Sequence, residues 1–116
     1  RIIIMAFPVF NNTSGFETEQ ENNGRECKII GVYIDPSDNS EIDAIAMPQF
    51  KIQFTDNEEI HSAYPDEIEK EFWTQDMHDY FAGLQAYIDG KKKCPFKETE
   101  RKKAWTFGFK HYDRNN

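Results

Sequence analysis

The sequence predicts an α+β protein in which a small antiparallel β domain precedes a C-terminal α-helical hairpin. Two observations support this fold class. Between Arg25 and Ile68 the apolar residues fall in short β-branched or alternating segments that polar turn residues separate. After Thr74 they recur every three or four positions, which is the spacing of one face of an α-helix. With 116 residues, 38% hydrophobic and 15% aromatic, the chain can build one compact domain with a core.

Residues 1–24 are expected to form an N-terminal strand and a flexible polar segment. Ile2–Phe10 is apolar, and its Pro8 would place it at a sheet edge. This segment is shorter than the ~20 residues of a membrane span and lacks the cleavage pattern of a secretory signal. We therefore expect no membrane association and a cytoplasmic location. Asn11–Gly24 predicts a linker or long surface loop, and Met5 is a candidate initiator.

The β domain is expected to cover residues 25–72. Cys27–Ile34 predicts a strand because it is rich in β-branched and aromatic residues, and the turn-forming residues 35–40 end it. Glu41–Met47 predicts a weaker strand. Phe50–Phe54 alternates apolar and polar residues, which is typical of a strand with one buried face.

A hairpin should follow, with Thr55–Glu59 as its turn and Ile60–Tyr64 as its returning strand. Pro65–Ile68 predicts a single helical turn that begins with proline. Residues 27–64 resemble small SH3-like or Tudor-like β barrels through this hairpin and the strand before it. The resemblance implies a curled antiparallel sheet.

Residues 73–116 are expected to form the helical hairpin. Thr74 is suited to cap a first helix, and Gly90 is suited to end it. The apolar stripe of this helix consists of Met77, Tyr80, Phe81, Leu84, Tyr87 and Ile88.

A second helix is predicted for Glu100–Asp113, capped by Thr99, with Trp105, Gly108, Phe109 and Tyr112 on one face. A glycine inside a helix costs about 1 kcal/mol relative to alanine, so Gly108 indicates the close approach of another backbone. In the connection, Pro95 should add stiffness and Phe96 should pack into the core.

The segment Gln85–Phe109 resembles ribosome modulation factor and its small relatives. The matching positions are Gln85-Ala86, Gly90, Cys94-Pro95-Phe96 and Trp105-x-x-Gly108-Phe109. That family is small, helical and basic, binds the small ribosomal subunit and promotes ribosome hibernation, and the segment also occurs in bacterial and phage proteins. The resemblance implies that Cys94, Pro95, Phe96, Trp105, Gly108 and Phe109 form a structural motif. Where the family has a basic arm before Gln-Ala, this chain is acidic.

Charge is distributed unevenly along the chain. Residues 1–89 carry 5 basic and 18 acidic side chains, a net charge of −13, whereas residues 90–116 carry 9 and 3, a net charge of +6. The basic segment either docks on the acidic part of the chain or contacts ribosomal RNA or a ribonucleoprotein. Candidate nucleic-acid-binding residues are Lys91, Lys92, Lys93, Lys97, Arg101, Lys102, Lys103 and Lys110, with Arg114 as a further basic residue.

An alternative function uses the acidic residues. They could form a protein–protein interaction module or inhibitor, of phage or mobile-element origin, that binds a basic protein. The residues concerned are Glu58, Glu59, Asp66, Glu67, Glu69, Glu71, Asp76 and Asp79.

Catalysis is not expected. His61, His78 and His111 are scattered, and the two cysteines, Cys27 and Cys94, are predicted to be free thiols without metal-ligand spacing. The chain contains no phosphate-binding glycine loop or nucleophile motif. We therefore expect no cofactor, no metal and no small-molecule substrate.

Overall fold

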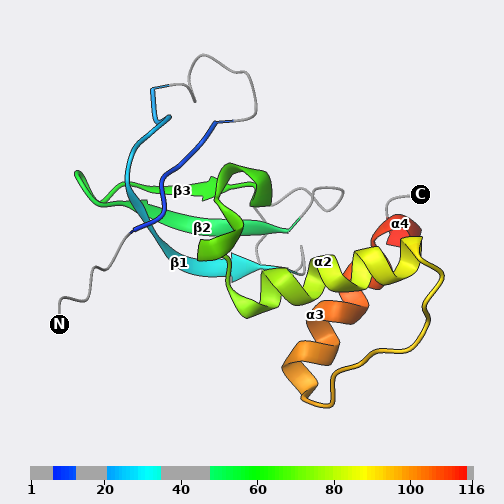
Figure 1. The fold of residues 1–116 in the computed structure, drawn as a ribbon. Coiled ribbons are helices and arrows are strands. Elements are labelled where there is room, and N and C mark those ends of the chain that lie inside the picture. The colour runs from blue at the N-terminus through cyan, green and yellow to red at the C-terminus, as the bar shows by residue number, and fades with distance from the viewer. Residues whose placement is uncertain (1–6, 13–20, 35–47, 115–116) are drawn as a thin grey trace, which may run out of the picture. The chain divides into compact units, whose positions relative to one another are not determined.

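A computed structural model describes residues 7–12, 21–34 and 48–114 of the chain (Figure 1). It confirms the predicted α+β class, because a three-stranded antiparallel sheet precedes the helices. The chain packs as two compact units. The first consists of Arg1–Gly31 and Gln49–Trp73, and the second consists of Val32–Pro48 and Thr74–Asn116.

The sheet contains β1 (Cys27–Tyr33), β2 (Gln49–Phe54) and β3 (Ile60–Ala63) in the order β1-β2-β3. All three strands lie where the sequence predicts them. Strands β2 and β3 are antiparallel and are joined by the predicted turn. The alternation in β2 has its expected result, because its three apolar side chains are almost completely buried: Phe50, Ile52 and Phe54.

Parts of the predicted N-terminal region and of the β domain lie outside the described residues. These are most of the Ile2–Phe10 strand, the middle of the Asn11–Gly24 loop, the turn at residues 35–40 and the weak strand Glu41–Met47. Within the described residues, Val9 forms an isolated antiparallel bridge. The SH3-like resemblance stays a prediction.

Aromatic side chains build the core of the first unit. The Phe10 and Phe54 rings meet edge to face, with centroids 6.1 Å apart. After β3 the predicted helical turn is present as η2 (Pro65–Glu67), and a second short turn, η3 (Lys70–Phe72), follows it. The Trp73 indole N–H donates hydrogen bonds to the carbonyls of Pro65 (3.1 Å) and Ile68 (2.8 Å), so Trp73 fastens this segment.

The first helix of the second unit, α2 (Gln75–Ile88), confirms the sequence prediction. Thr74 is its N-cap residue, although the Thr74 hydroxyl makes no capping hydrogen bond. At the other end Gly90 adopts φ = 75°, the left-handed conformation that glycine tolerates best.

The prediction of the second helix is wrong in two details. The structure contains α3 (Thr99–Phe109), whose N-cap residue is Glu98 rather than Thr99, and a separate short helix α4 (His111–Arg114). Lys110 separates them as the C-cap residue of α3, because its φ of −92° and ψ of 7° depart from helical geometry. Just after this break the His111 Nδ1 atom lies 2.6 Å from the Tyr80 hydroxyl, a contact between segments that sequence periodicity does not reveal.

Helices α2 and α3 pack side by side through their backbones (Figure 1). A Cβ atom added to Gly108 would lie only 1.7 Å from the Tyr80 carbonyl oxygen, which confirms the predicted close approach. Gly83 has the reciprocal role, because a Cβ there would lie 1.9 Å from the Trp105 carbonyl oxygen. Each glycine thus accommodates the backbone of the opposite helix. No helix among the described residues has the length and apolar character that crossing a membrane requires.

Candidate nucleic-acid interface

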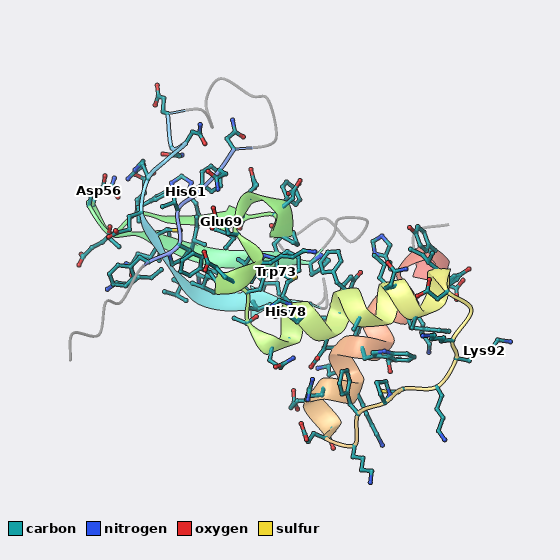
Figure 2. The ribbon with its side chains drawn as sticks, in the orientation of Figure 1. Asp56, His61, Glu69, Trp73, His78 and Lys92 are labelled. Carbon is teal, nitrogen blue, oxygen red and sulfur yellow. The ribbon has the colours of Figure 1, made fainter. Side chains whose placement is uncertain are left out.

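Six exposed lysines belong to the α2–α3 connection and the beginning of α3, and we call them the lysine set. Four of them lie in the connection, because Gly90 ends α2 and the chain then runs without regular structure as far as residue 97. The other two are exposed on α3. Figure 2 shows the Lys92 side chain extending away from this connection. No ammonium group of the set forms an ion pair with another described residue. The members are Lys91, Lys92, Lys93, Lys97, Lys102 and Lys103.

Two other predicted basic residues lie apart from the lysine set in the sequence. Lys110 is exposed at the end of α3, and Arg114 is the last residue of α4.

The Arg101 side chain forms an ion pair within the protein. Its Nε and Nη2 atoms donate hydrogen bonds of 3.0 Å each to the two carboxylate oxygens of Asp79. The Asp79 side chain is 2% exposed and also accepts a bond from Gln75 Nε2 at 3.0 Å. The hydrogen bonds to Asp79 raise the pKa of Arg101. Arg101 therefore joins α3 to α2 through its pair with Asp79, and its contact with nucleic acid stays a prediction.

The predicted structural motif occupies the same hairpin. Trp105 and Gly108 are buried, and the Trp105 ring stacks on Phe109 with centroids 5.0 Å apart. Phe96 is half-buried rather than enclosed in the core, and the Arg101 guanidinium lies 3.9 Å from the centre of its ring.

The remaining motif residues belong to the connection. Cys94 is half-buried, with its Sγ 3.8 Å from the carbonyl oxygen of Phe96, and Pro95 is exposed.

An open pocket of about 450 Å³ lies within the second unit. Its apolar lining comes from three separate segments: Ala82 and Ala86 on α2, Pro95 in the connection and Trp105 on α3. The two alanines leave room for a ligand because their side chains are small. Trp105 adds aromatic surface even though it is only 5% exposed.

Polar residues also line this pocket. Lys91 and Lys93 belong to the lysine set, Gln85 lies in the last turn of α2, and Asp89 is the C-cap residue of that helix. The Gln85 side chain donates a hydrogen bond from Nε2 to Asp89 Oδ1 at 3.0 Å. The pocket thus has a carboxylate and an amide beside two ammonium groups.

Sequence reasoning did not identify the pocket, because its lining comes from segments up to 23 positions apart. One signal could have indicated it. Gln85, Ala86, Pro95 and Trp105 all belong to the pattern that resembles ribosome modulation factor, and all four line the pocket.

The predicted acidic set divides into buried and exposed members. Asp79 is buried in its pair with Arg101, and Glu67 is 3% exposed and accepts a hydrogen bond from the Tyr64 backbone N–H at 2.8 Å. The exposed members are Glu58, Glu59, Asp66, Glu69, Glu71 and Asp76.

Local contacts also shift the pKa values of two exposed carboxyl groups. A hydrogen bond with Glu69 raises the pKa of Glu71, whereas hydrogen bonds from His61 and Asn57 lower the pKa of Glu59. Among the described residues, no group of His, Cys, Asp and Glu side chains is arranged to hold a metal ion.

Both cysteines are free thiols, as predicted. Burial raises the pKa of Cys27 to about 11, which disfavours its reactive thiolate. Cys94 is half-buried in the connection.

Comparisons with protein-family models, with curated proteins and with solved structures found no match for this chain.

Proposed function

We propose that this protein is a non-enzymatic binding protein whose lysine set contacts the phosphates of ribosomal RNA or of a ribonucleoprotein. The observation that carries the proposal is that six exposed lysines occur within 13 residues and form no ion pair with any described residue. Lysine ammonium groups neutralise phosphates as point charges and release the counterions around them. The resemblance to ribosome modulation factor supports the ribosomal class of RNA.

The helical hairpin is a suitable support for such contacts. Gly83 and Gly108 bring the backbones of α2 and α3 together, and the Arg101–Asp79 pair joins the same helices. The Trp105 side chain is largely inside this packing. We therefore assign most of the affinity to phosphate contacts rather than to stacking on exposed aromatic rings.

The expected salt dependence follows from the number of charges. If all six lysines contact phosphates of a single strand, the slope of log K against log salt is about −4. A fourfold increase in salt would then weaken binding by roughly 300-fold. A complex held mainly by apolar contact would lack this dependence.

The test measures the affinity of the full chain for purified small ribosomal subunits and for single-stranded RNA at low and high salt. The variant K91Q/K92Q/K93Q should bind more weakly and should reduce the slope by about 2. The matched control K28Q/K51Q/K70Q removes the same number of charges from the first unit and should keep the slope. Salt-independent binding, or equal losses in the two variants, would overturn the proposal.

The acidic residues support a second candidate, a module that binds a basic protein. The observation that favours it is that Glu69 and Glu71 are both exposed and lie within hydrogen-bonding reach of each other, a contact that raises the pKa of Glu71. Two adjacent exposed carboxyl groups suit a basic side chain of a partner. A pull-down from a bacterial lysate with the wild type and E69Q/E71Q distinguishes the candidates. If the wild type captures one basic protein and E69Q/E71Q does not, the second candidate is supported. If both capture ribosomal RNA and ribosomal proteins, the first candidate is supported.

A further inference from the structure

We infer that the pocket beside the lysine set binds the base of one unpaired nucleotide and prefers guanine. This inference rests on the proposed function and specifies its ligand. The volume of the pocket, about 450 Å³, lies at the small end of the range of about 300–1,000 Å³ for ligand sites. A single nucleobase suits such a space, because Ala82 and Ala86 leave it open and the exposed Pro95 offers apolar surface beside the edge of Trp105.

The polar lining determines which base fits. Gln85 donates its amide N–H to Asp89 Oδ1, and this bond orients both side chains. Gln85 Oε1 and Asp89 Oδ2 receive no hydrogen bond from the other described residues. Both residues line the pocket, and in the proposed complex these two oxygens accept hydrogen bonds from the base.

Guanine is the base whose Watson–Crick edge complements two acceptors. Its N1–H and N2–H groups are adjacent donors, and a carboxylate accepts both kinds of N–H. Adenine, cytosine and uracil each place an acceptor next to their donor on this edge, so one of the pocket's acceptors would face another acceptor. An unmatched polar group of this kind lowers affinity.

The charges in the pocket determine the orientation of the nucleotide. Lys91 and Lys93 line the same pocket and can contact the flanking phosphates, whereas the Asp89 carboxylate repels phosphate from its own position. The base would therefore lie toward Asp89 and the phosphates toward the lysines. Only an unpaired nucleotide can bind in this way, because the Watson–Crick edge is occupied in a duplex.

The experiment compares two labelled RNAs, an oligouridine of about eight nucleotides and the same strand with one central guanosine, by fluorescence anisotropy. The wild-type chain should bind the guanosine strand about tenfold more tightly, which is within the discrimination of a bidentate base contact. Inorganic phosphate should compete with both strands equally, whereas guanosine monophosphate should compete more strongly for the guanosine strand.

Two variants test the pocket without removing a lysine. Asp89→Asn replaces one acceptor with a donor and should reduce the guanosine-to-uridine affinity ratio to about one. The matched control Asp113→Asn, at an exposed position of α4 outside the pocket, should retain the ratio. Ala82→Phe fills the pocket from an exposed helix position and should also remove the preference, with the far-UV circular dichroism spectrum unchanged.

The outcomes separate this inference from the proposed function. If both strands bind equally and with steep salt dependence, the proposed function stands and the guanine pocket is wrong. If the preference survives in both Asp89→Asn and Ala82→Phe, the base is recognised elsewhere and the inference is again wrong. If neither strand binds, the inference is wrong, and the measurement with small ribosomal subunits decides the proposed function separately.

Discussion

Replacing Gly108 with alanine tests whether backbone contact between α2 and α3 holds the second unit together. The added Cβ would lie 1.7 Å from the Tyr80 carbonyl oxygen and 3.1 Å from the Leu84 backbone nitrogen. The Tyr80 atom belongs to a helix backbone, so no side-chain rotation can relieve the overlap. The helices would have to separate by at least about 1.3 Å to restore even a 3.0 Å contact.

Two effects of opposite sign decide the result. Alanine favours an α-helix over glycine by about 1 kcal/mol. Overpacking a close contact costs about 1–3 kcal/mol and occasionally more, and the separation also loosens the buried rings of Tyr80 and Trp105. Because the overlap is with backbone, we expect the upper part of that range to apply. The net loss in the free energy of unfolding should be about 2 kcal/mol, or roughly 8 °C in Tm.

Urea denaturation followed by far-UV circular dichroism measures this loss. Gly83→Ala should behave similarly, since its Cβ would lie 1.9 Å from the Trp105 carbonyl oxygen. Lys103→Ala, at an exposed position of α3, is the control and should change stability by less than about 0.5 kcal/mol. A Gly108→Ala variant that is as stable as the wild type, or about 1 kcal/mol more stable as helix propensity alone would give, would contradict a close backbone contact between α2 and α3.

Two further predictions concern the Arg101–Asp79 pair and the thiols. Arg101→Met leaves the buried Asp79 carboxylate with only the Gln75 bond, so the free energy of unfolding in urea denaturation should fall clearly more than in Lys103→Ala, and the double variant with Asp79→Leu should lose less. At pH 8 a thiol reagent should modify Cys94 quickly and Cys27 only after denaturation, because burial raises the pKa of Cys27 to about 11. Since burial favours the protonated thiol, the contribution of Cys27 to stability is complete below the ordinary pKa of 9.0 and is lost as pH rises through about 11. Equal reaction rates of the two thiols in the folded protein would contradict this prediction.

The elements that could be predicted from sequence are those with a strong local signal. Strand β2 alternates apolar and polar residues, and α2 has an apolar stripe bounded by Thr74 and Gly90. In both cases the burial pattern is a direct consequence of the geometry of the element. Gly108 was also informative, because a glycine inside a helix has an energetic cost that close packing can offset.

The error in the second helix arose where a long-range contact competed with local preference. Helical spacing extended the second helix through Lys110, whereas the structure breaks it there and brings His111 to the Tyr80 hydroxyl. Arg101 appeared as one of nine similar basic residues, and only folding shows that it faces Asp79. Sequence composition cannot distinguish a charge that is paired inside the protein from one that remains available to a partner.

By itself, the sequence determined the α+β class, the positions of the main strands and of α2, and the concentration of positive charge in the C-terminal segment. These properties depend on side chains that are neighbours along the chain. The tertiary structure alone decided that Gly83 and Gly108 bring two helix backbones together, that Arg101 is paired, and that Gln85, Asp89 and Trp105 line one pocket. These properties depend on distances between residues far apart in the chain, which are set only when α2 packs against α3.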